Sequence, residues 1–275
     1  MDKRLLTIQD ISCVGQCSLT VALPVISACG IETAILPSSV LSNHTAPGFS
    51  GWTFTDLTND MPKILERWLT EKIDFDAFYT GYVSKAQIPY ILDIMKKTAR
   101  SGALRIVDPV MADNGVMYAG FDDDFPEEMK KLVNGADVIM PNLTEASFLL
   151  GIPYDPVLTE AKTEKILKDL HKLGAKNVIL TGVSFEESKL GAACYDGVKT
   201  DYYFAEKQPR SCHGTGDVYA SAVAGALVRG KSLVEASAIA ADFVVESIKK
   251  TQDDKDHWYG VKFEKALPYL IERLK

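Results

Sequence analysis

The 275-residue sequence lacks an apolar run approaching the ~18 residues that a membrane-spanning helix needs. Its opening residues, MDKRLLTIQD, also lack the apolar stretch of a signal peptide. The five cysteines are odd in number and form no C-x-x-C pair, which favours free thiols in a reducing compartment over a disulfide framework. The formal net charge of −7 argues against a nucleic-acid surface. We therefore expect a soluble, cytoplasmic protein that binds neither membrane nor nucleic acid.

No linker, low-complexity segment or internal repeat interrupts the chain, so we expect residues 1–275 to form one domain. Short β-branched segments alternate with amphipathic helical patterns, which is typical of a mostly parallel sheet covered by helices on both faces. Strands are predicted over residues 4–10, 33–39, 77–83, 104–110, 136–142 and 176–182, followed by an antiparallel pair at 190–197 and 200–207. Helices are predicted over 57–72 and 159–174 and from residues 216, 231 and 261 onward.

Polar residues follow six of the predicted strands, at the carboxyl ends where sheets of this kind bind ligands. These residues are Asp10, Ser12, Asn43–Thr45, Tyr82, Asp108, Asn142, Glu145 and Thr181–Ser184. Loops that converge from six strand ends predict a single shared site at that edge of the sheet.

The segment GTGD, Gly214–Asp217, directly precedes an alanine-rich helical pattern. Its glycines allow an anion to approach the backbone, and the amides of a helix N-terminus attract negative charge. Donors aimed at a phosphoryl group in transfer would form an anion hole, and the Asp217 carboxylate could take the proton of an attacking hydroxyl. The alternative is that Asp217 only caps the helix and the glycines only form a turn.

A second phosphate-binding pattern lies close by, because Gly225–Ser232 reads GALVRGKS and matches the P-loop formula. A P-loop must follow a strand, whereas the residues before Gly225 are alanine-rich and periodic as in a helix. Gly230 is therefore predicted to end that helix and Ser232 to cap the next one. A P-loop nucleotidase that uses Lys231 is the less favoured alternative.

Several segments together resemble the ribokinase-like superfamily, in the spacing of its vitamin kinase branch. They are GTGD at the start of a helix, DPVM at 108–111 and PNLTE at 141–145. LSNHT at 41–45 is similar to the S-N-H-T segment of pyridoxal kinases, and residues 7–30 resemble the first strand and helix of that group. The resemblance covers nearly the whole chain. It implies a three-layer α/β/α fold with a mostly parallel central sheet and no separate lid domain.

The resemblance further implies ATP-dependent phosphorylation of the 5′-hydroxymethyl group of pyridoxal, pyridoxamine or pyridoxine, with Mg²⁺. Asp217 would be the general base, and the amides of Gly214, Thr215 and Gly216 would form the anion hole. The implied substrate contacts are Asp10, Ser12, His44, Thr45, Tyr82 and Asp217. The implied ATP contacts are Asp108, Asn142, Glu145, Thr181, Phe204, Lys207, Gly214 and Gly216, with Asp108 and Glu145 also near the metal.

The sequence departs from the pyridoxal kinase pattern at the segment IQDIS, which places Asp10 where that family often has serine. Whether Asp10 or Ser12 contacts the ring is therefore open, and Asp10 is similar to the acidic residue of hydroxymethylpyrimidine kinases. The alternatives are such a pyrimidine kinase and a B6-binding protein without turnover. The Cys212 thiol could add to an aldehyde substrate or be buried and inert. The resemblance also implies a homodimer and leaves a need for K⁺ open.

Overall fold

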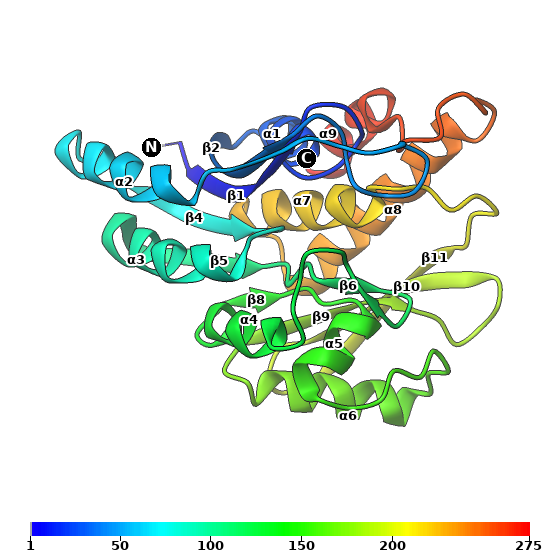
Figure 1. Ribbon diagram of the computed structural model, residues 1–275. Helices are drawn as coiled ribbons and strands as arrows, with labels where there is room; N and C mark the ends of the chain where they lie inside the picture. The colour runs from blue at the N-terminus through cyan, green and yellow to red at the C-terminus, as the bar shows by residue number, and fades with distance from the viewer. Residues whose placement is uncertain (1) are drawn as a thin grey trace.

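The computed structural model describes residues 2–275, whose centre is a nine-stranded sheet (Figure 1). In spatial order the sheet runs β11 (Thr200–Glu206), β10 (Lys189–Tyr195), β9 (Asn177–Val183), β8 (Val138–Ile139), β5 (Ala99–Val107), β4 (Phe75–Thr80), β1 (Arg4–Ser12), β2 (Glu32–Leu41) and β3 (Phe54–Asp56). A separate two-stranded sheet consists of β6 (Ala112–Asp113) and β7 (Val116–Met117).

The six strands from β2 to β9 in this spatial order are parallel, whereas β10, β11 and β3 are antiparallel to their neighbours. The predicted antiparallel pair is therefore confirmed. Strand β1 pairs with β2 on one side and β4 on the other, so the chain builds the sheet outward in both directions from β1. Ligands of doubly wound sheets bind at the carboxyl ends of the strands beside such a reversal.

Helices cover both faces of the sheet. One layer contains α2 (Met61–Thr70), α3 (Ile88–Thr98), α4 (Phe125–Val133), α5 (Leu143–Leu150) and α6 (Glu160–His171). The other contains α1 (Leu19–Ala28), α7 (Thr215–Val228), α8 (Leu233–Thr251) and α9 (Leu267–Arg273). Short 3-10 helices span Thr58–Asp60, Lys85–Gln87 and Phe263–Lys265. None of the helices described is long and apolar enough to cross a bilayer.

The alternation of side chains along β1 divides the core into two apolar layers. Leu6 and Ile8 pack with the first helical layer, and Leu5 packs with the second, all three fully buried. This arrangement follows from the two-residue period of a strand. The predicted three-layer α/β/α architecture is confirmed.

Several predicted boundaries differ from the observed ones by a few residues, and two are wrong for identifiable local reasons. The strand predicted over 136–142 contains only the two residues of β8, because Pro141 has no amide to continue the ladder and Asn142 already caps α5. The helix predicted from residue 261 begins at Leu267, with a proline in its first turn. Ser232 caps α8 as predicted, and its hydroxyl and the Glu235 side chain form a capping box.

The P-loop alternative is contradicted by the same region. Residues 225–228 lie inside α7, and Gly230 follows its end with a left-handed φ of 90°. Helix α7 itself leads into this segment, so the amides of residues 225–228 are hydrogen-bonded within the helix rather than directed at a phosphate.

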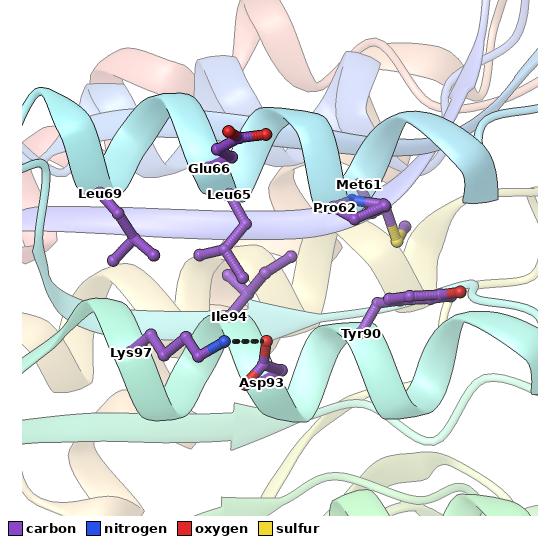
Figure 2. A pocket seen from close by; sticks show the side chains of 9 residues that line it. All are labelled: Met61, Pro62, Leu65, Glu66, Leu69, Tyr90, Asp93, Ile94 and Lys97. Carbon is purple, nitrogen blue, oxygen red and sulfur yellow. Dashed lines mark hydrogen bonds and ion pairs between the residues drawn. The ribbon is translucent and has the colours of Figure 1, made fainter.

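A shallow groove of about 270 Å³ lies between α2 and α3 (Figure 2). Leu65 and Leu69 of α2 point across it toward α3, Leu65 toward Ile94 and Leu69 toward Lys97. None of its lining residues belongs to the predicted site, which lies at the strand ends.

Candidate active site

Gly214 begins the predicted anion hole as the N-cap of α7. Its φ of 75° is in the left-handed region, and its carbonyl accepts the Val218 amide at 3.0 Å to start the helix. A β-carbon at Gly214 would lie 1.6 Å from the Gln16 carbonyl oxygen, so a larger residue does not fit. Gly216 is different, because it is exposed and a β-carbon there would meet nothing within 4 Å. The first amides of α7 are thus presented at an open helix N-terminus.

Asp217 lies in the first turn of α7 beside the loop that follows β1. Burial of its carboxylate raises its pKa to about 7, the Ser18 amide lowers the pKa by hydrogen bonding, and the Asp10 charge raises it. The Ser18 backbone has an unusual left-handed φ of 51° for a residue other than glycine. A carboxylate with a pKa near neutrality is suited to accept a proton from a substrate hydroxyl.

Asp10 and Ser12 lie two residues apart on β1, so the alternation of the strand places both side chains on one face. The pairing of β1 with β2 shifts register beside them, between Gln9 and Ile11, because β2 has one extra residue there. Both side chains are buried, and the Ser12 hydroxyl donates to Asp10 Oδ2 at 2.9 Å. Burial raises the Asp10 pKa, which hydrogen bonds from Ser18 and Ser12 lower. Bulges of this kind redirect side chains beside active sites.

Tyr82 follows β4 and faces the same region. Burial raises the pKa of its phenol, and the negative charge of Asp10 raises it further. Its ring packs against Phe121 with centroids 5.1 Å apart. Tyr82 and Asp217 therefore both lie near Asp10, whose charge raises the pKa of each.

His44 holds the loop between β2 and β3 through both ring nitrogens. Nδ1 accepts the Ala46 amide at 3.2 Å, so Nε2 carries the proton that it donates to the Tyr259 carbonyl at 3.0 Å. Burial lowers the His44 pKa, which keeps the ring neutral. Neither nitrogen is left for a substrate in this arrangement, whereas the next residue, Thr45, is exposed.

Asp108 and Glu145 form a buried carboxylate pair at the ends of β5 and β8. Glu145 accepts the Asn142 amide at 2.8 Å and the Met111 amide at 3.2 Å, while burial raises its pKa to about 8. The Asn142 side chain accepts the Glu145 amide at 2.9 Å, which completes a capping box for α5. Burial raises the Asp108 pKa well above its usual value, with further increases from Glu145 and Asp217.

Repelling buried carboxylates fit a site that becomes stable when a cation binds. Among residues 2–275 no group of three or more histidine, cysteine or acidic side chains is arranged as a complete metal site. Mg²⁺ in nucleotide enzymes commonly uses one or two carboxylates together with phosphate and water oxygens. The pair formed by Asp108 and Glu145 fits that requirement.

The predicted nucleotide contacts lie at the same edge of the sheet. Thr181 pairs with Asn142 across an isolated bridge, which joins β9 to the start of α5. Phe204 of β11 packs against Phe185 at a centroid distance of 5.4 Å, and Lys207 is exposed directly after the strand.

Several neighbours of the site were not predicted. Burial raises the pKa of the Cys17 thiol, and the nearby charges of Asp217 and Asp10 raise it further. Burial and the nearby Glu145 raise the pKa of Tyr118, which follows β7. No sequence motif marks these residues. Burial also raises the Cys212 pKa, which favours the inert thiol over the reactive one.

Comparison with known proteins agrees with this geometry. The sequence model of the phosphomethylpyrimidine kinase family matches residues 54–261. The pyridoxal kinase of Lactobacillus plantarum superposes with a TM-score of 0.90 at 33% identity, covering 98% of this chain and 97% of that one. A Bacteroides thetaiotaomicron protein, provisionally named a phosphomethylpyrimidine kinase and crystallised with pyridoxal, superposes with a TM-score of 0.92 at 36% identity, covering 98% and 96%.

Among curated proteins, the pyridoxal kinase of Dictyostelium discoideum is 29% identical over 247 residues, covering 83% of this chain and 80% of its own length. Family match, fold and motifs agree. The chain therefore belongs to the phosphomethylpyrimidine kinase family, within the ribokinase-like superfamily that its motifs predicted.

Proposed function

We propose that this protein is a pyridoxal kinase that transfers the γ-phosphoryl group of ATP to the 5′-hydroxymethyl group of pyridoxal, pyridoxamine or pyridoxine. The observation that carries the proposal is the position of Asp217, whose pKa is raised to about 7, one turn into a helix that opens with the left-handed Gly214. Similarity to the pyridoxal kinases of L. plantarum and D. discoideum supports the choice of substrate.

In the proposed reaction, the Asp217 carboxylate takes the proton of the 5′-hydroxyl group as its oxygen attacks the γ-phosphorus. The bond from that phosphorus to the β,γ-bridging oxygen breaks, and ADP leaves with the electron pair. The amides of Gly214, Thr215 and Gly216 donate to the oxygens of the transferred group while their charge increases. The vitamer phosphate forms, and the proton stays on Asp217 until solvent removes it.

Asp108 and Glu145 would hold Mg²⁺, which when bound offsets the negative charge of the nucleotide phosphates. Backbone amides already orient the Glu145 carboxylate, and the Asp108 carboxylate is buried. We propose that Thr181, Phe204 and Lys207 line the nucleotide site. Asn142 is proposed to orient the nucleotide phosphates beside Mg²⁺.

The vitamer ring is proposed to lie between Tyr82 and the loop that carries Thr45, with Asp10 and Ser12 at one edge. His44 acts on this site by fixing the loop. A homodimer is a further expectation from the resemblance, a cytoplasmic location is one from the composition, and K⁺ dependence is open. Size-exclusion chromatography tests the homodimer, and assays with K⁺ in place of Na⁺ test the K⁺ dependence.

One rival substrate has a specific observation in its favour. The matching family is named for phosphomethylpyrimidine, and the hydroxymethylpyrimidine/phosphomethylpyrimidine kinase of Aquifex aeolicus is 28% identical over 177 residues, covering 62% of this chain and 66% of its own length. The acidic Asp10 at the ring edge is also similar to that family.

The deciding experiment is magnesium-dependent ADP release with pyridoxal, pyridoxamine, pyridoxine, hydroxymethylpyrimidine and ribose supplied separately. Turnover of the B6 vitamers above the other two compounds is the expected result. Turnover of the pyrimidine alone would assign the rival substrate. Tight pyridoxal binding without ADP release would instead indicate a B6-binding protein.

A further inference from the structure

Arg210 binds three backbone carbonyl groups of a segment more than 40 residues away. Its Nη1 donates to Thr251 O and to Asp254 O, and its Nη2 donates to His257 O, all at 2.8 Å. The planar guanidinium can serve several acceptors at once, which the compact ammonium of lysine cannot do with the same geometry. These contacts lie outside every site predicted from the sequence.

The carbonyls belong to residues 251–260, which connect α8 to the C-terminal helices and are called the latch below. Its turn is stabilised from within, because Asp254 Oδ1 accepts the amides of Asp256 at 3.1 Å and His257 at 3.3 Å. Lys262 reaches back by an ion pair with Asp254 and by its amide, which donates to Thr251 Oγ1 at 2.8 Å. Arg210 thus binds a turn whose conformation is already fixed by hydrogen bonds and an ion pair.

The far end of the latch holds the loop between β2 and β3, residues 42–53. Tyr259 O accepts His44 Nε2 at 3.0 Å, which fixes the residue before Thr45. The Trp258 ring packs on Phe49 with centroids 4.8 Å apart, and a β-carbon at Gly48 would lie 2.3 Å from Trp258. In Figure 1 the latch, between α8 and α9, and the loop after β2 reach the same side of the molecule.

Arg210 also stands four residues before Gly214, in the segment that leads from β11 to the anion hole. A single guanidinium therefore joins the backbone that carries the anion hole to the backbone that fixes His44. Two further contacts link these segments. The Gln16 amide donates to Tyr259 O at 3.4 Å, and the Gln16 carbonyl abuts Gly214. The His44 ring also packs against that of His213, directly before Gly214, with centroids 5.6 Å apart.

We propose that Arg210 is a positioning residue that, through the latch, sets the distance between the β2–β3 loop and the anion hole, and thereby the binding of the vitamer. This inference rests on the proposed function for its substrate. Arg210 contacts neither the reacting atoms nor the nucleotide. Its loss should weaken vitamer binding while leaving the phosphoryl transfer machinery of α7 in place.

The test compares Arg210→Ala and Arg210→Lys with Arg229→Ala in the full chain. Arg229 is a matched control, since its Nη1 donates to Cys29 O at 3.1 Å in a similarly part-buried place and ties the end of α7 to the end of α1. We expect Arg210→Ala to raise KM for pyridoxal by about tenfold or more, with kcat and KM for ATP within about threefold of wild type. The pyridoxal KM of Arg210→Lys should lie between those of the wild type and Arg210→Ala. Arg229→Ala should lower Tm without raising the pyridoxal KM.

Hydrogen exchange of the substrate-free protein gives a readout that does not depend on turnover. Arg210→Ala should exchange faster in residues 251–260 and in residues 42–53, while Arg229→Ala should not. Faster exchange in the latch alone, or an equal rise of the pyridoxal KM in Arg229→Ala, would overturn the positioning role. If Arg210→Ala does not fold, Arg210→Lys decides by the same two measurements. If the wild type phosphorylates no vitamer, the proposed function fails and the exchange result still decides the role of Arg210.

Discussion

The carbonyl oxygen of Gln16 occupies the space that a β-carbon at Gly214 would need, at a distance of 1.6 Å. The loop after β1 and the start of α7 are therefore fixed against each other at the anion hole. This contact explains why glycine stands at the first position of GTGD. It does not explain Gly216, which has open space around it.

Alanine at the two glycines should consequently have different effects on stability. Gly214→Ala introduces a clash with backbone and a left-handed alanine, so we expect the free energy of unfolding to fall by about 2 kcal/mol or more. Gly216→Ala should leave it unchanged or raise it by up to about 1 kcal/mol, because alanine favours the helix. Urea unfolding measures both. Equal destabilisation by the two substitutions would contradict the assignment of the contact to Gly214.

Asp217→Asn should separate catalysis from binding. Losing the proton acceptor is expected to lower kcat by about 10²–10⁴-fold. The dissociation constant for pyridoxal should stay within about threefold, since the amide keeps the shape of the side chain. Asp242→Asn is the control, because Asp242 lies in the middle of α8, where it accepts from Tyr203 of β11 and pairs with Arg273 of α9. A kcat reduced equally in both variants would remove Asp217 from the reaction.

The raised pKa of Asp217, about 7, predicts a rise of kcat/KM with pH, levelling off above neutrality. The same shift predicts lower stability at high pH. The carboxylate loses its proton more readily in the unfolded chain, so its contribution to stability falls as pH rises from about 4 to about 7. From pH 5 to pH 8 the free energy of unfolding of Asp217→Asn should therefore rise by about 2–3 kcal/mol relative to that of the wild type, measured by urea unfolding. A constant difference would show that the pKa is not raised.

Local signals predicted the parts of this fold that depend on neighbouring residues. Ser232 predicts a helix start because an N-cap depends on one residue type beside the first turn, and the GTGD glycines predict a backbone turn. The strand ends placed Asp10, Tyr82 and Asp108 near one another because parallel strands share an edge.

Contacts between distant segments could not be predicted in the same way. His44 and Tyr259 are 215 residues apart, and the bond between them involves a backbone carbonyl that any residue would provide. Ser18 adopts a left-handed φ that its residue type disfavours, so the surrounding packing rather than propensity decides it. The sequence likewise contains no motif that predicts the role of Arg210, because its acceptors are all main-chain carbonyl oxygens.

We expect Asp108 to lower the stability of the metal-free protein and to contribute to magnesium binding. Burial and the charges of Glu145 and Asp217 disfavour its ionised form, so Asp108→Asn should unfold at a higher temperature than the wild type without added metal. With MgCl₂ and an ATP analogue the order should reverse, since a ligand stabilises the state that binds it and the amide is a weaker partner for Mg²⁺. Thermal unfolding with and without both ligands measures the two differences in Tm between variant and wild type. Asp123→Asn is the control, because Asp123 is exposed. A Tm increment from MgCl₂ and nucleotide that is as large in Asp108→Asn as in the wild type would place the metal elsewhere.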